Sequence, residues 1–205
     1  MKRWIKCALL LVTASSMMST AMAQTTTELP ANLNWQTMSL LAFNFDHPGY
    51  EGTQGERDVA WSIWGSTIEA YPDGAHKGTK PNGNKWPSFI IIKGFESGNT
   101  RYIFSSLRAA SVAYNDCEDG INGGNEHTPI YTKCPMRLTV ENTKTLQSSE
   151  TTYSDFCNMS INYKDQPKEK NYEQVAVDSE TKTAYFRVVQ YGKLRPECNR
   201  AIRLP

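Results

Sequence analysis

The sequence predicts a mainly β protein, built as a β-sandwich-like domain or as a related antiparallel β-rich domain with two disulfide bonds. First, seven to nine short runs of β-branched and aromatic residues are separated by turn residues, a pattern typical of stacked antiparallel sheets. Second, an even number of cysteines follows an export signal, which indicates disulfide bonds formed outside the cytoplasm. We expect one globular domain over residues 35–205, with one or two short helices as an option at residues 58–71 or 105–115.

The first 23 residues have the organisation of a cleavable signal peptide. A positively charged start is followed by an apolar centre at residues 8–12 and by Ala21-Met22-Ala23, the small residues that precede a cleavage point. The apolar centre is far shorter than the roughly 20 residues of a membrane-spanning helix. We therefore expect cleavage after Ala23, a flexible polar N-terminus over residues 24–34, and a periplasmic or secreted protein that does not insert into a membrane.

The charge balance of the mature chain excludes whole classes of partner. Removal of the signal takes away three of the 22 Lys and Arg residues and none of the 21 acidic ones, which leaves a formal charge of −2. A balance of this kind gives no electrostatic attraction to nucleic acid or to an anionic membrane.

The cysteines of the mature chain are expected to form two disulfide bonds. Four cysteines allow three connectivities, and spacing alone does not choose among them. We favour Cys117–Cys134, which closes a short loop, and Cys157–Cys198, which ties the C-terminal tail back to the domain. A zinc site is the alternative, but no two of these cysteines have the close spacing of zinc knuckles.

The stretch from Ser88 to Cys134 is the predicted centre of the fold. Phe89-Ile90-Ile91-Ile92 is the only run of four large apolar residues in the mature chain, which predicts a strand covered on both faces. The segment Glu96-Ser97-Gly98-Asn99 follows as a turn in which glycine supplies a positive φ. A second strand over residues 101–104 therefore completes a hairpin.

Two further regions have clear strand patterns. In residues 35–45, alternation places Leu41, Phe43 and Phe45 on one face, with Met38 and Leu40 on the other. Near the C-terminus, residues 174–177 and 183–191 flank a polar turn and predict a second hairpin. One face of its second strand is expected to carry Ala184, Phe186 and Val188.

Residues 58–71 fit two patterns. With a period of two, Val59, Trp61 and Ile63 alternate with smaller or aromatic residues, which is typical of a strand. With a period of 3.6, Ala60, Trp64, Ile68 and Tyr71 form the stripe of a helix. The β-branched and aromatic content and Gly65 favour a strand, and both tryptophans are expected to fill the core. Residues 105–115 have the same ambiguity, and the preceding hairpin favours a strand there.

Three connections are long for a compact domain, namely residues 46–57, 72–87 and 115–129. Each is rich in glycine and holds one of the three histidines of the chain. A tryptophan at the end of the second loop offers an aromatic face for stacking or for anchoring a partner. The predicted ligand-binding residues are His47, His76, Trp86 and His127.

We expect no metal site and no cofactor. The three histidines stand on separate loops, unlike paired metal ligands on one element. Calcium is the alternative, because residues 116–126 contain many carboxylate and amide oxygens. The ligand order of an EF-hand is absent, however, and Asp, Asn and Gly are also ordinary turn residues.

The motif content favours binding over catalysis. The chain contains no Gly-x-Ser-x-Gly elbow, no Ser-x-x-Lys and no His-Glu-x-x-His. A disulfide-bonded scaffold with long glycine-rich loops indicates an exported binding module that recognises a protein or glycan of the cell envelope. The alternative is an envelope hydrolase that acts on cell-wall or glycan substrates through loop carboxylates or a histidine.

Overall fold

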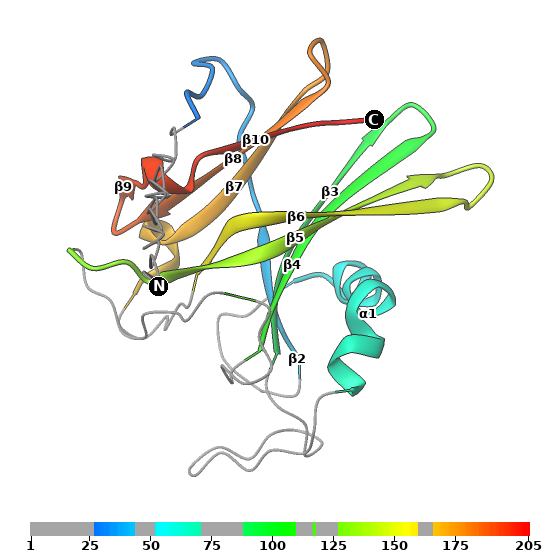
Figure 1. Cartoon of the computed structure of the whole chain (residues 1–205), viewed down its shortest axis with the longest axis horizontal. Coiled ribbons are helices and arrows are strands. Elements are labelled where there is room, and N and C mark those ends of the chain that lie inside the picture. The colour runs from blue at the N-terminus through cyan, green and yellow to red at the C-terminus, as the bar shows by residue number, and fades with distance from the viewer. Residues whose placement is uncertain (1–26, 44–51, 71–87, 110–116, 118–126, 160–165) are drawn as a thin grey trace, which may run out of the picture.

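Two antiparallel sheets pack against each other, and one helix covers the outer face of the second sheet (Figure 1). The computed structural model describes residues 27–43, 52–70, 88–109, 117, 127–159 and 166–205. Mainly antiparallel β structure with one α-helix and two disulfides confirms the predicted fold class.

Sheet A has the strand order β1-β7-β8-β10, with β9 beside β8, and sheet B has the order β2-β3-β4-β5-β6. The strands of sheet A are β1 (Gln36–Thr37), β7 (Tyr172–Asp178), β8 (Thr183–Gln190), β9 (Lys193–Leu194) and β10 (Arg200–Arg203). Those of sheet B are β2 (Ser39–Phe43), β3 (Ser88–Ser97), β4 (Thr100–Ala109), β5 (Tyr131–Asn142) and β6 (Ser148–Met159). The helices are α1 (Gln54–Glu69) and the short 3-10 turns η2 (Lys168–Lys170) and η3 (Pro196–Cys198).

The apolar run in β3 is covered on both faces, as its composition predicts. Phe89 and Ile91 belong to the core between the sheets, whereas Ile90 and Ile92 pack toward the helix. Strand β2 divides in the same way, since alternate side chains of a strand point to opposite faces. Its Leu40 and Ala42 belong to the core between the sheets, whereas Leu41 and Phe43 belong to the cluster under the helix.

Both predicted hairpins are present. Ser97 pairs with Thr100 across a two-residue turn, and Gly98 has a φ of 62°, as the tight turns between antiparallel strands require. Strands β7 and β8 form the second hairpin. Its predicted apolar face, Ala184, Phe186 and Val188, lies in the core between the sheets.

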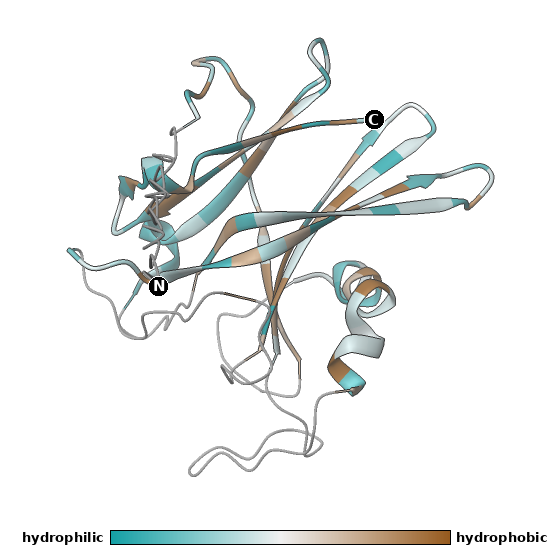
Figure 2. Ribbon diagram, in the orientation of Figure 1, coloured by the Kyte–Doolittle hydropathy of each residue, from teal (hydrophilic) through white to brown (hydrophobic). Residues whose placement is uncertain are grey.

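That inter-sheet core contains a group of aromatic rings. Phe104 of sheet B and Phe186 of sheet A meet edge to face with ring centroids 5.2 Å apart, and Phe156 meets Phe186 at 4.9 Å. Each aromatic pair of this geometry stabilises the fold by about 0.5–1.5 kcal/mol beyond the stabilisation that comes from burying the rings. The core takes hydrophobic residues from both sheets, and hydrophobic segments occur in the strands of both (Figure 2).

The strand predicted for residues 58–71 is wrong, because Gln54–Glu69 is a helix. Thr53 and Glu56 form a capping box at its start, which satisfies backbone donors that a helix end leaves unpaired. The 3.6-residue stripe of Ala60, Trp64 and Ile68 is buried against sheet B. A Cβ at position 65 would lie 3.0 Å from the Trp61 ring, so a larger residue there would require that ring to shift by a few tenths of an ångström.

The other ambiguous segment begins as the favoured strand, since β4 runs to Ala109, and residues 110–115 lie outside the described ones. Strand β6 has no counterpart among the sequence predictions. Its first seven residues are polar or exposed apart from half-buried Tyr153, and it is defined by its long pairing with β5. The alternation of polar and apolar residues that marks other strands is therefore missing.

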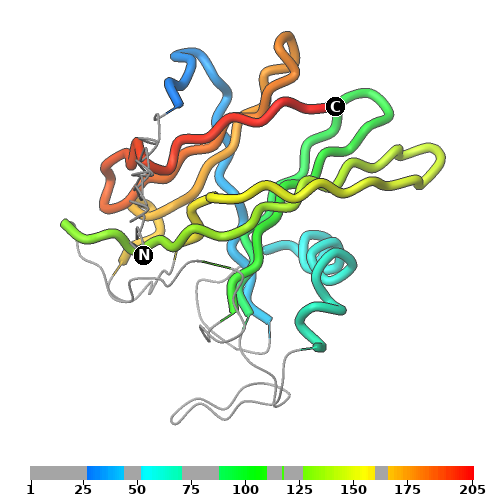
Figure 3. The backbone as a smooth tube through the Cα atoms, in the orientation of Figure 1, coloured from blue at the N-terminus to red at the C-terminus, as the bar shows by residue number. Residues whose placement is uncertain are grey.

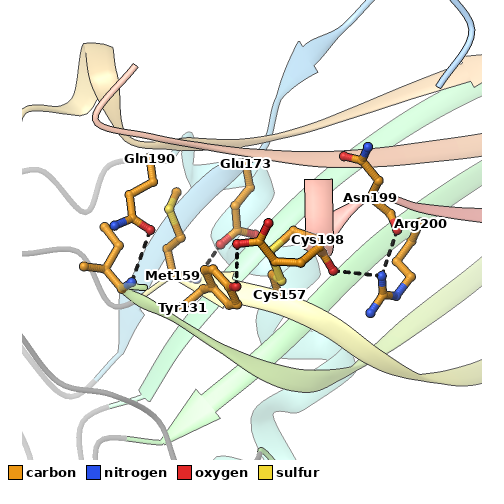
Figure 4. Close-up of a disulfide and its surroundings, with 10 residues drawn as sticks. Tyr131, Cys157, Met159, Glu173, Gln190, Cys198, Asn199 and Arg200 are labelled. Atoms are coloured by element: carbon orange, nitrogen blue, oxygen red, sulfur yellow. Dashed lines mark hydrogen bonds between the residues drawn. A yellow bond between two sulfur atoms is a disulfide. The ribbon is translucent and has the colours of Figure 1, made fainter. Parts of the chain in front are cut away.

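Both predicted disulfides are confirmed, with Cα separations of 4.1 Å for Cys117–Cys134 and 5.6 Å for Cys157–Cys198. The second joins β6 of sheet B to η3, which precedes the edge strand of sheet A (Figure 4). Two disulfides indicate an oxidising, exported location. In the described part of the chain, no helix has the length and apolarity needed to cross a membrane.

Candidate functional site

A cleft of about 440 Å³ lies between the first turns of α1 and the β3–β4 hairpin. It opens on the face of sheet B that is turned away from sheet A, because its floor residues pack toward the helix. The helix contributes one wall and the hairpin the other. The lining residues are Thr53, Gly55, Glu56, Val59, Ile92, Lys93, Gly94, Glu96, Arg101 and Ile103.

The helix wall is fixed by Glu56. Its Oε2 atom accepts a hydrogen bond from the backbone N–H of Thr53 at 2.9 Å, while the Thr53 Oγ1 accepts one from the Glu56 N–H at 3.2 Å. Its Oε1 atom accepts a further hydrogen bond from the Ser39 hydroxyl at 2.7 Å. Glu56 therefore caps its own helix and ties that helix to the start of β2.

These contacts also set the charge of Glu56. Its partial burial acts to raise the pKa, but the hydrogen bonds from Ser39 and Thr53 and the positive charge of Lys93 together lower it below its ordinary value. The group is therefore a carboxylate throughout the neutral and mildly acidic range, and it places a fixed negative charge at the mouth of the cleft.

The hairpin wall carries an ion-pair ladder that runs across three strands. Arg101 on β4 contacts Glu96 on β3 at 2.8 Å and Glu141 on β5 at 3.5 Å. Both partners stand directly opposite Arg101 in the strand registers. Exposed pairs of this kind contribute little to stability. Their consequence here is that the guanidinium is held between two carboxylates at the cleft rim.

The floor of the cleft is aliphatic, and a glycine stands at one position beside it. Ile92 and Ile103 are buried there, and Val59 is half-buried beside them. Gly94 stands opposite Ile103 in the register, and no heavy atom lies within 4 Å of the position that a Cβ on Gly94 would occupy. The absence of a side chain at Gly94 therefore leaves room above the floor.

A separate aromatic surface lies on α1. The Trp61 side chain is 41% exposed and packs against Phe43, with ring centroids 5.6 Å apart. Trp64 differs, since it is buried and donates from Nε1 to the Ser105 hydroxyl at 3.0 Å. The expectation that both tryptophans fill the core is thus right for Trp64 and wrong for Trp61.

Most of the ligand-binding residues predicted from sequence fall outside the described residues. This applies to His47, His76 and Trp86, and to the proposed calcium loop, of which only Cys117 is described. His127 is described; it is exposed, precedes β5, and is not among the cleft-lining residues. Within the described ranges, no three His, Cys, Asp or Glu residues are grouped as a metal site would require.

The cleft residues themselves were missed by the sequence analysis. One local signal was available, because Thr53-x-x-Glu56 is the pattern of a capping box and marks the start of a helix. Reading it would have placed Gly55 and Val59 on the same helix as Glu56. Nothing local, however, relates residues 53–59 to residues 92–103.

Comparison with known proteins adds no assignment. No family model matches the chain, and neither a curated protein nor a solved structure matches it.

Proposed function

We propose that this protein is an exported binding protein, periplasmic or secreted after cleavage behind Ala23, which recognises a protein partner of the cell envelope. The observation that carries the proposal is the cleft between α1 and the β3–β4 hairpin. Ligand sites are typically concave and mostly apolar, with a few polar groups that orient the ligand. An aliphatic floor with charged groups on its rim has this composition.

A protein partner fits the cleft better than a glycan. Sugar rings are commonly bound by stacking on aromatic faces, and none of the described residues that line the cleft is aromatic. Aliphatic floors with charged rims suit peptide side chains, which combine apolar stems with charged ends. The exposed ring of Trp61 supports a glycan as the second candidate, at a different place on the same helix.

The alternative of an envelope hydrolase is less well supported by the cleft. Glycoside hydrolysis needs a carboxyl group that can donate a proton, and such groups have a raised pKa. The pKa of Glu56 is lowered, and Glu96 is engaged by Arg101. Turnover of a cell-wall substrate that is abolished by Glu56→Gln would replace the binding proposal with this alternative.

Filling the cleft tests the proposal. Gly55→Trp projects an indole into the cleft from the helix wall, and the position has room because the nearest atom to its Cβ site is Thr53 Oγ1 at 4.0 Å. Removing a glycine also favours the helix. Ser66→Trp is the matched control, since Ser66 is exposed on the same helix and does not line the cleft.

The measurement is capture of partners from an envelope extract by each immobilised variant, followed by mass spectrometry. We expect a protein that is retained by the wild type and by Ser66→Trp and is lost with Gly55→Trp. Equal capture by all three would contradict the cleft as the binding site. Captured material that resists protease and contains sugar would favour the glycan, and Trp61→Ala would then be expected to release it.

A further inference from the structure

Sheet A turns a second set of side chains away from the core. Val175 and Phe186 are paired neighbours on β7 and β8, and both belong to the core between the sheets. Because side chains alternate along a strand, Gln174 and Arg187, which are also paired, point to the opposite, outer face. Helix α1 and the cleft lie on the far side of sheet B (Figure 3), so this outer face is a separate surface.

Arg187 is held in place on this face by hydrogen bonding and by stacking. Its Nε–H donates to the side-chain oxygen of Gln174 at 2.8 Å, and the amide nitrogen of Gln174 donates to the Thr37 hydroxyl at 3.5 Å. The Arg187 Cζ atom lies 4.1 Å from the centroid of the Trp35 ring, which is a close cation–π contact. The guanidinium is therefore fixed at its Nε edge and on one of its faces.

The two Nη atoms of Arg187 remain available to a ligand. In the described part of the chain, no hydrogen bond or ion pair engages either of them. Neither is among the buried polar atoms that lack a partner, so both reach the solvent. The planar fork of N–H groups on these atoms matches the two oxygens of a carboxylate. Arg187 therefore presents a positioned carboxylate-binding group.

Within the described residues, no carboxylate compensates the charge of Arg187. Glu173, its acidic neighbour on β7, is buried and faces the core. Asp178 lies on the outer face, but about 13 Å further along the sheet, and both of its oxygens accept hydrogen bonds from Thr181 in its own turn. Burial lowers the pKa of Arg187, and Tyr172 acts in the opposite direction. An arginine stays charged nonetheless, so this cation lacks a counter-ion in the fold.

Aromatic side chains surround Arg187. Trp35 contacts the guanidinium, and the register places Tyr185 beside Arg187 in one direction along the sheet and Tyr172 in the other. All three rings are half-buried, so part of each is accessible. Sugar rings stack on aromatic surfaces of this kind. Rings next to a carboxylate-binding fork therefore favour a sugar acid over the carboxylate of an acidic peptide, which needs no stacking partner.

We propose that the outer face of sheet A around Arg187 binds an acidic glycan, with the Nη atoms of Arg187 paired to the carboxylate of a uronate residue. A uronate combines the two features that the face accommodates, namely an anion for the fork and a sugar ring for the neighbouring aromatic side chains. The site is additional to the cleft on sheet B, and the proposal does not depend on what the cleft binds.

Two substitutions of Arg187 separate the fork from the charge. Arg187→Gln removes both and should weaken uronate binding at least tenfold. Arg187→Lys keeps the charge, but an ammonium group cannot make the paired contact, so binding should weaken at least threefold. Arg203→Gln is the matched control, because Arg203 is an exposed arginine on β10 of the same sheet. It should change binding by less than about twofold.

The probes are tetrasaccharides of galacturonate, glucuronate and mannuronate, titrated into the mature protein and followed by ligand-detected NMR. Each is compared with the same tetrasaccharide whose carboxylates are converted to methyl esters. We expect the wild type to bind at least one uronate and to bind its ester at least tenfold more weakly. This comparison uses only the wild type, so it decides the matter even if circular dichroism finds Arg187→Gln misfolded.

Other outcomes would contradict the proposal. Absence of binding by every uronate at millimolar concentration would overturn it, as would equal binding of acid and ester or undiminished binding by a folded Arg187→Gln. Binding of hexaglutamate that depends on Arg187, without binding of any uronate, would replace the glycan by an acidic peptide. Gly55→Trp should bind the uronate as tightly as the wild type. If it abolishes uronate binding, the sugar lies in the cleft and the assignment to sheet A is wrong.

Discussion

The side chain of Glu173 accepts a hydrogen bond from the backbone N–H of Met159 between the two sheets, beside the Cys157–Cys198 disulfide (Figure 4). The adjoining cavity measures only about 10 Å³, close to the minimum for a single water molecule. The carboxyl group is therefore isolated from solvent. Burial raises its pKa to about 8, although the Met159 N–H and the charge of Arg108 act in the opposite direction.

The first prediction is that stability falls as the pH rises through the neutral range. The folded protein keeps a proton on Glu173 up to about pH 8, whereas the unfolded chain releases it near 4.5. The free energy of unfolding should therefore decrease between these values, with a slope of up to about 1.4 kcal/mol per pH unit, and level off above pH 8. Urea titrations at pH 5, 6, 7, 8 and 9 measure this slope.

Glu173→Gln keeps an acceptor for Met159 and cannot lose a proton. The free energy of unfolding of this variant should fall less steeply between pH 4.5 and pH 8 than that of the wild type. At pH 9 the variant should be the more stable protein. Glu169→Gln is the matched control, because Glu169 is exposed on η2. Equal slopes in the wild type and Glu173→Gln would show that Glu173 is ionised in the folded protein at neutral pH.

The second prediction concerns two tryptophans that lie three residues apart on α1. Trp64 is buried under the helix, donates a hydrogen bond to Ser105 and has the Arg137 guanidinium 3.7 Å from its ring centroid. Trp64→Ala should therefore lower the free energy of unfolding by about 3–5 kcal/mol. Trp61→Ala removes a half-exposed ring and one aromatic contact, so its effect should stay near 1 kcal/mol.

Chemical denaturation followed by circular dichroism compares the two variants. Similar losses for both would mean that the helix presents a different face to sheet B. Trp64→Phe gives an intermediate point, because it keeps an aromatic ring and leaves Ser105 without its donor. A loss of about 1–2 kcal/mol is expected for it.

The same helix explains where sequence analysis succeeds and fails. In β3, four consecutive large apolar residues predict burial on both faces, and both faces are covered. In α1, Trp61 and Ile63 lie on the flanks of the buried stripe and are only partly covered. Their alternation with smaller residues imitates a strand. The Thr53–Glu56 capping box marks the start of a helix and so decides between the two patterns. It lies before residues 58–71, the segment whose pattern is ambiguous.

Strand β6 and the cleft were not predictable from local patterns. The first half of β6 is exposed and rich in serine and threonine, so its identity as a strand depends on pairing with β5 rather than on burial. The cleft depends on the distance between α1 and the β3–β4 hairpin, which no local pattern encodes. The favoured disulfide pairing is confirmed, but the pattern did not dictate it, because Cys157–Cys198 joins β6 of sheet B to η3 beside sheet A, and no local pattern relates these segments.

The third prediction ranks the two disulfides. In the chain-entropy description, a bond stabilises by restricting the unfolded chain, and the effect grows with the length of the closed loop. Sequence separations of 17 and 41 residues correspond to about 3 and about 4 kcal/mol. Cys157 and Cys198 are also both buried in the inter-sheet core, so replacing them by alanine removes packing as well. The double variant at Cys157 and Cys198 should therefore be destabilised more than the double variant at Cys117 and Cys134.

Urea unfolding of the two double alanine variants measures the difference, and non-reducing peptide mapping of the wild type provides the reference. The map should contain both intramolecular bonds and no free thiol among the four cysteines. Because a domain of this size has a total stability of only about 5–15 kcal/mol, the variant without Cys157–Cys198 is expected to unfold at distinctly lower urea. If the variant without Cys117–Cys134 proved the less stable of the two, the short loop rather than the link between the sheets would dominate stability.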